Sequence, residues 1–112
     1  MLTWTKGRQK KSSYKVMKIL ESAIFGFDIY LIRMVEGDRI GIHDDKVFPS
    51  TLEHHRINFI LKKAEVGGYF VCNGPFWSFR DRIIKFRPDK YKHQVTKVYK
   101  GKRLVFSIGW VN

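Results

Sequence analysis

The feature that most constrains the fold is a series of short segments with strand-like composition, separated by glycine and proline. β-Branched, aromatic and other apolar residues dominate residues 28–35, 39–43, 56–62, 69–72, 83–87, 95–99 and 103–110. Turn-forming residues lie between them, at 26, 36–38, 67–68, 73–75, 88–89 and 100–101. Many short strands at near-regular spacing predict an all-β sandwich or barrel. Residues 14–24 form too short a segment for periodicity to distinguish a helix from a strand.

A chain of 112 residues with 44% hydrophobic content is expected to fold as one globular domain. Residues 1–13 are basic and poor in apolar residues, which predicts a loosely ordered arm ahead of a folded domain at 14–112. No apolar run is long enough to span a bilayer, and the first residues lack the order of a secretory signal. The single cysteine, Cys72, excludes an internal disulfide framework. A cytoplasmic protein without membrane association is therefore expected.

The charge of the chain is strongly positive, with 22 Lys and Arg against 10 Asp and Glu and a net charge of +12. Such a charge favours an acidic or polyanionic partner, nucleic acid first among them, although a solvated basic surface is the alternative. An aromatic and basic cluster at residues 76–82 either stacks on single-stranded bases or packs as ordinary core and rim. One hypothesis for the whole chain is accordingly a non-catalytic basic β-sandwich that binds nucleic acid.

A second hypothesis comes from a His-x-Asp pair, His43 and Asp45, and from His93 about fifty residues later. Alternate residues of an extended strand share a face, so His43 and Asp45 are expected to point the same way. Two imidazoles and one carboxylate on one face are the ligand set of non-haem Fe(II) oxygenases. A lone His-x-Asp pair also occurs on surface turns, and His54 and His55 are expected to lie on the surface or behind the ligands.

The last apolar segment carries one arginine, Arg103, ten residues after His93, and Ser107 shares its face by the period of two. An inward arginine needs an anionic partner, because a buried unpaired guanidinium is costly. A dicarboxylate co-substrate supplies one through a bidentate contact. The alternative is that Arg103 belongs to the basic surface.

These residues together resemble the Fe(II)/2-oxoglutarate-dependent dioxygenases, and most closely the prolyl-hydroxylase-like branch with its small bacterial and phage members. The resemblance rests on His43-x-Asp45, His93 and Arg103, and on the segments around them at 31–38, 56–70, 86–95 and 103–110. It implies a double-stranded β-helix, that is, a cupin-like jelly roll with few or no helices. It also implies a cytoplasmic enzyme, bacterial or phage-encoded.

The resemblance further implies a hydroxylase that uses Fe(II), 2-oxoglutarate and O2, with ascorbate as an occasional reductant, and releases succinate and CO2. The substrate would be a macromolecule, either a protein side chain such as proline or a nucleic acid. Many relatives carry Tyr where this chain has Met34, which puts a co-substrate contact from that position in doubt. Relatives also carry helices that cover the barrel, so an oligomer or a partner is a further expectation.

Four further positions complete the predicted site. Alternation along 56–62 places Asn58 inward, where it either contacts 2-oxoglutarate, as Arg103 and Ser107 are expected to do, or forms a buried amide contact with the backbone. Arg56 on the same face either contacts substrate or forms a structural ion pair. Arg33 and Trp77 are the remaining candidates for substrate contacts.

Overall fold

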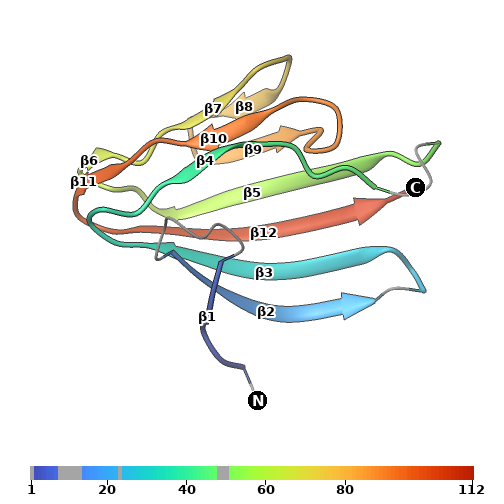
Figure 1. Cartoon of the computed structure of the whole chain (residues 1–112), viewed down its shortest axis with the longest axis horizontal. Coiled ribbons are helices and arrows are strands. Elements are labelled where there is room, and N and C mark those ends of the chain that lie inside the picture. The colour runs from blue at the N-terminus through green and yellow to red at the C-terminus, as the bar shows by residue number, and fades with distance from the viewer. Residues whose placement is uncertain (1, 8–13, 23, 48–50) are drawn as a thin grey trace.

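The computed structural model describes residues 2–7, 14–22, 24–47 and 51–112 (Figure 1). Within these ranges every regular element is a β-strand, which confirms the predicted all-β class. The strands are β1 (Thr5–Lys6), β2 (Lys15–Ser22), β3 (Phe27–Met34), β4 (Ile40–His43), β5 (His54–Lys62), β6 (Val66–Gly67), β7 (Phe70–Cys72), β8 (Trp77–Phe79), β9 (Ile83–Phe86), β10 (His93–Val95), β11 (Val98–Lys100) and β12 (Arg103–Val111). No helix of the described residues has the length and apolar character needed to cross a membrane.

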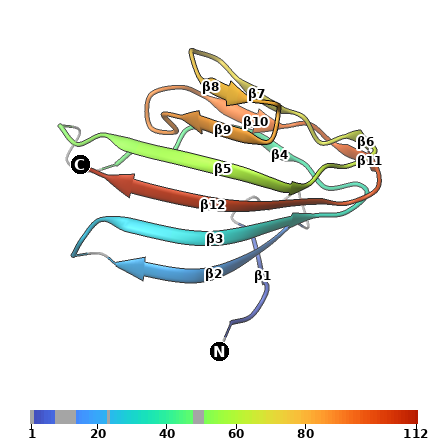
Figure 2. The ribbon, with the colours of Figure 1, turned by 180° about the vertical axis from the view of Figure 1, so that it is seen from behind.

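The larger layer is a seven-stranded sheet in the order β1-β2-β3-β12-β5-β9-β8. β12 lies at its centre and pairs antiparallel with both β3 and β5. A three-stranded sheet, β4-β10-β7, forms the opposing layer, and β6 and β11 pair at one end of the molecule (Figures 1 and 2). The last strand of the chain is therefore the centre of the main sheet, an arrangement that only non-local pairing produces.

Side chains alternate strictly between the two faces of β12. Arg103, Val105 and Ser107 are buried and face the opposing layer, while Leu104 and Phe106 between them are only half-buried. β5 repeats the pattern, with Arg56 and Asn58 buried. The predicted face assignments of both segments are thus confirmed. The buried polar residues of both strands lie on the inner face of the sheet.

The hydrophobic core lies between the layers, at the end where β6 and β11 close the barrel. It is built from Tyr14, Met34, Ile40, Val95 and Val98. Further along the same sheet, Arg56, Asn58 and Ser107 occupy the inner face in place of apolar residues.

Several element predictions change in the structure. Residues 15–22 of the ambiguous 14–24 segment form a strand, and segment 95–99 is divided between β10 and β11. Residues 77–79, expected to lie between strands, form the edge strand β8 because they pair with β9. Of the predicted basic arm, Thr5 and Lys6 pair with β2, whereas residues 8–13 lie outside the described residues.

Candidate metal centre

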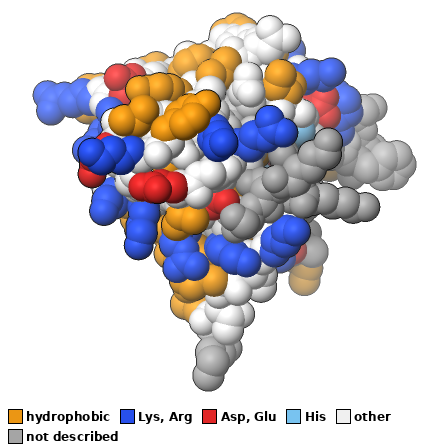
Figure 3. All heavy atoms as spheres, turned by 60° about the vertical axis from the view of Figure 1, so that its left-hand side comes forward, with side chains coloured by type: hydrophobic (Ala, Val, Ile, Leu, Met, Phe, Trp, Pro, Cys, Tyr) orange, Lys and Arg blue, Asp and Glu red, His pale blue; other side chains and the backbone are white. Residues whose placement is uncertain are grey.

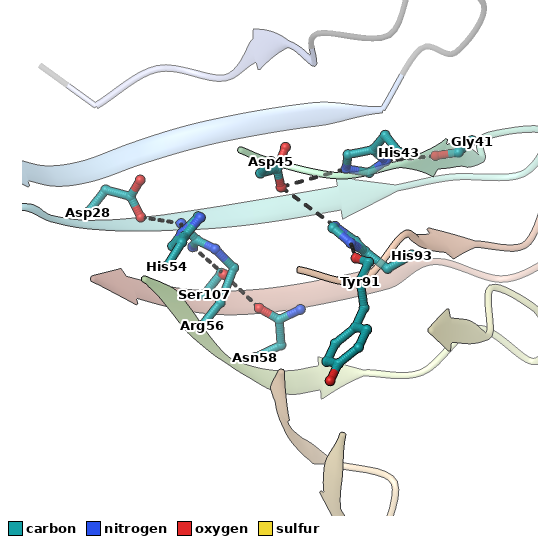
Figure 4. A network of polar contacts seen from close by, with 10 residues as sticks. All are labelled: Asp28, Gly41, His43, Asp45, His54, Arg56, Asn58, Tyr91, His93 and Ser107. Atoms are coloured by element: carbon teal, nitrogen blue, oxygen red, sulfur yellow. Dashed lines mark hydrogen bonds and ion pairs between the residues drawn. The ribbon is translucent and has the colours of Figure 1, made fainter. Parts of the chain in front are cut away.

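Two histidines face each other across neighbouring strands. His43, the last residue of β4, and His93, the first residue of β10, are directly opposite in the antiparallel register. Their ring centroids are 4.3 Å apart (Figure 4). Strand pairing thus converts a separation of about fifty residues in sequence into a side-by-side pair of imidazoles.

Asp45 completes the cluster from the segment that follows β4. Its backbone N–H donates to the carbonyl oxygen of Pro88 at 2.7 Å, which fixes the chain beyond the strand. Its Oδ2 lies 3.5 Å from Nε2 of His93 and 3.8 Å from Nε2 of His43. One donor atom from each of the three residues lies within 4.8 Å of the others. The predicted convergence of the three side chains is therefore observed in the structure.

Backbone carbonyls set the orientation of both rings. Nδ1 of His43 lies 2.7 Å from the carbonyl oxygen of Gly41, and Nδ1 of His93 lies 3.0 Å from that of Tyr91 (Figure 4). A carbonyl only accepts, so Nδ1 of each ring is the donor in these contacts, and Nε2 of each ring faces Asp45. Histidines that bind metals are commonly held in this way by a hydrogen bond from the other ring nitrogen. Two such imidazoles and one carboxylate fit a divalent transition-metal ion.

The cluster lies in a cavity of about 470 Å³ between the two layers. Its lining includes all three candidate ligands, and also Arg56, Asn58 and Arg103, which the sequence placed inward. His54 lines it as well. β3 adds Asp28, Tyr30 and Ile32. The volume suits a small organic molecule bound beside a metal ion, since ligand pockets typically measure about 300–1,000 Å³.

Arg103 is a buried cation without an acidic partner among the described residues. Its side chain is 2% exposed, Nη1 lies 4.0 Å from Sδ of Met34, and Nη2 has no hydrogen-bond partner. Burial lowers the pKa of Arg103 from 12.5 to about 10. It also lines a neighbouring cavity of about 260 Å³. A buried guanidinium without a partner would be stabilised by an anion that binds in the cavity.

A polar network on the inner face surrounds the second buried arginine, Arg56. Its Nη2 donates to Oδ1 of Asp28 at 2.6 Å, and its Nη1 donates to Oγ of Ser107 at 2.8 Å. Ser107 in turn donates to Oδ1 of Asn58 at 2.6 Å. Arg56 thus forms a structural ion pair, which was one of its two predicted roles. Ser107 and Asn58 are hydrogen-bonded to each other.

Sequence reasoning missed three residues of this cavity. Asp28 and Tyr30 share the inner face of β3, and the guanidinium of Arg56 lies over the Tyr30 ring at 4.6 Å. Burial raises the pKa of Tyr30, with Arg56 opposing the effect. His54, expected on the surface or behind the ligands, has its Nε2 3.3 Å from Nη2 of Arg56, and burial followed by Arg56 lowers its pKa. The period of two along residues 28–34 was the available signal for Asp28 and Tyr30.

The two remaining candidates for substrate contacts do not line this cavity. Arg33 points to the outer face of β3, where its guanidinium lies 4.5 Å from the centroid of the Trp4 ring. Trp77 points outward from the edge strand β8 and is 55% exposed. Strand alternation is the reason in both cases, because the neighbouring residues on each strand occupy the inner face.

The fold and the cluster together define the protein as an all-β, cupin-like jelly roll with a candidate metal site. No family model matches the sequence, and no curated protein matches it either. Similarity to solved structures is clear at the level of the fold. A prolyl-4-hydroxylase from Pseudomonas putida superposes with a TM-score of 0.70 at 12% identity, over 97% of this chain and 77% of that chain.

Other solved structures with the same fold differ in their described roles. A predicted oxalate decarboxylase from Thermotoga maritima superposes with a TM-score of 0.67 at 11% identity, over 99% of this chain and 92% of that chain. The cupin domain of Cnp3 from Schizosaccharomyces pombe gives a TM-score of 0.66 at 10% identity, over 94% of this chain and 66% of that chain. At these identities the similarity establishes the fold, and the function has to be argued from the site.

Proposed function

We propose that the protein is an Fe(II)- and 2-oxoglutarate-dependent dioxygenase that hydroxylates a C–H bond of a macromolecular substrate. The observation that carries the proposal is the buried, unpartnered Arg103, which lines the same cavity as the cluster of His43, Asp45 and His93. A metal site alone is common to many cupin folds. A metal site that shares its cavity with an unneutralised cation selects for an anionic co-substrate.

His43, Asp45 and His93 would hold the metal through two Nε2 atoms and one carboxylate oxygen. When bound, Fe(II) supplies the capacity to reduce O2 beside a chelated 2-oxo acid. The overall reaction balances: 2-oxoglutarate, O2 and substrate C–H give succinate, CO2 and substrate C–OH. One oxygen atom enters succinate and the other enters the hydroxyl group.

Arg103 would bind the far carboxylate of 2-oxoglutarate, and this contact would satisfy its unpartnered Nη2. Asn58 and Ser107 would support the binding of 2-oxoglutarate from neighbouring positions on the inner face. Their mutual hydrogen bond, with Arg56 donating to the same hydroxyl, holds these side chains in one arrangement. We propose that Ser107 contributes mainly by positioning Asn58 and Arg56.

The polar network also controls charge within the cavity. Asp28 neutralises Arg56, so Arg103 is the buried cation left to attract a co-substrate. Tyr30, whose pKa is raised by burial, keeps its hydroxyl proton and stays a hydrogen-bond donor at neutral pH. The similarity in fold to a prolyl-4-hydroxylase supports hydroxylation as the reaction, and a protein side chain such as proline as one substrate class.

The test is succinate formation by the purified protein with Fe(II), ascorbate, O2 and 2-oxoglutarate. We expect slow uncoupled turnover without substrate, and loss of that turnover in Asp45→Ala. Asp44→Ala is the matched control, because Asp44 is adjacent in sequence and its Oδ2 lies 3.6 Å from Nζ of Lys46. Equal turnover of the two variants would remove Asp45 from the ligand set.

The role of Arg103 is tested by changing the co-substrate together with the protein. 2-Oxopentanoate keeps the 2-oxo acid of 2-oxoglutarate and lacks its far carboxylate. The wild-type protein should bind 2-oxoglutarate at least about tenfold more tightly than 2-oxopentanoate, since a charged hydrogen bond contributes roughly 1.5–3 kcal/mol. Arg103→Met should bind both equally. Retained preference in the variant would place the far carboxylate elsewhere.

A further inference from the structure

We propose that the outer face of the main sheet, at its β8 edge, binds single-stranded nucleic acid by stacking bases on exposed aromatic rings. The site, here called the aromatic strip, is made of the exposed rings of Trp77 and Phe79 together with Lys85. The half-buried Trp110, on whose ring His55 stacks, lies beside it. The aromatic strip lies on the face of the sheet opposite to the metal cavity, because the inward neighbours Ser78 and Ile84 line the inner cavity of about 260 Å³. The proposal is therefore independent of the metal chemistry.

The rings of Trp77 and Phe79 are open to solvent and are not part of the hydrophobic core. Trp77 and Phe79 project from the same face of β8, and they are 55% and 47% exposed. Their ring centroids are 6.2 Å apart and their planes differ by only 6°. Two near-parallel rings open to solvent offer successive stacking surfaces for nucleobases, which bind aromatic side chains without regard to sequence.

Cations stand beside the rings of the strip. Lys85 lies directly opposite Trp77 on the neighbouring strand, and its Nζ is 5.9 Å from the centroid of the Trp110 ring. The guanidinium of Arg80, in the β8–β9 turn, lies 5.2 Å from the Phe79 ring. Alternation of ring and cation matches the alternation of base and phosphate along a single strand.

The charge of this face selects the partner. Pairing register places Lys15, Arg33 and Lys85 on the outer face of β2, β3 and β9, and it places no acidic residue on the outer face of those strands or of β12. Figure 3, which brings the side of the molecule with β6 and β11 forward, shows Lys and Arg side chains among hydrophobic ones there as well. A second copy of the chain would bring like charges together, whereas a polyanion with aromatic groups complements the face.

The experiment measures binding of a fluorescein-labelled (dT)15 oligonucleotide to the full chain by fluorescence anisotropy, without added metal. We expect binding that weakens steeply with salt and that is at least about fivefold weaker in Trp77→Ala, since each stacked base contributes roughly 1–3 kcal/mol. The tryptophan emission of the wild-type protein should be quenched on binding. A duplex of the same length should bind more weakly, because its bases are not free to stack.

Matched controls separate stacking from general charge attraction. Tyr99 is 65% exposed and Lys97 lies 5.6 Å from its ring, so this pair repeats the ring and cation of the strip elsewhere on the surface. Tyr99→Ala and Lys97→Gln should change affinity for (dT)15 by less than twofold, and Lys85→Gln by more than Lys97→Gln. Equal effects at the two places would overturn the proposal, as would equal affinity for heparin and (dT)15. A dimer that Trp77→Ala dissociates would also overturn it, because the strip would then be a contact between copies.

Discussion

Replacing the buried Arg103 by methionine is expected to stabilise the metal-free protein while abolishing its preference for 2-oxoglutarate over 2-oxopentanoate. The pKa of Arg103 falls from 12.5 to about 10 because the charged form is buried without a partner. Each pKa unit corresponds to 1.36 kcal/mol, so the charged guanidinium costs the folded state ~3 kcal/mol at any pH below about 10. Stability would rise only above that pH, where the folded state loses the proton before the unfolded chain does. Methionine fills similar space beside Met34 without the charge.

The assay is urea unfolding of the metal-free protein at pH 7.5, with 2-oxoglutarate binding measured separately on metal-loaded samples. We expect a gain of about 1–3 kcal/mol for Arg103→Met, since part of the relief is offset by imperfect packing. The matched control is Arg56→Met, which removes the ion pair with the half-exposed Asp28 and should destabilise by about 1–3 kcal/mol. A destabilised Arg103→Met variant would refute the reasoning, because it would mean that Arg103 already has a partner within the protein.

Three further predictions concern the backbone, pH and the metal. In the same urea assay, Gly67→Ala should lower the free energy of unfolding by more than about 3 kcal/mol, because Gly67 has φ +78° and a Cβ there overlaps the carbonyl oxygen of Lys97. Gly37→Ala is the control and should cost about 1 kcal/mol, because Gly37 has φ +92° but open space around it. The pKa of His54 is lowered in the folded state, so on acidification the unfolded chain takes up the proton first and the folded state loses stability. Lowering the pH from 7.5 to 5.5 should therefore reduce the melting temperature less in His54→Asn than in the wild type. Millimolar Fe(II) under anaerobic conditions should raise the melting temperature of the wild type and leave His93→Ala unchanged, and equal shifts would show that the ion binds elsewhere.

Much of the inner face follows from local sequence alone. The alternation along 56–62 and 103–110 placed Arg56, Asn58, Arg103 and Ser107 inward, and burial of all four confirms it. The same rule applied to residues 28–34 would have found Asp28 and Tyr30. It works because a side chain's face depends only on the extended backbone and the residue's parity.

What the sequence by itself determined is an all-β chain with His43, Asp45, His93 and Arg103 as its distinctive polar residues. Only the tertiary structure decided that His93 pairs opposite His43, that Asp28 neutralises Arg56, and that Arg103 is left unpartnered. The turns and the period of two are set by neighbouring residues. The partner of each strand is set by burial and pairing across the whole chain, so the charge balance of the cavity exists only once the sheet has formed.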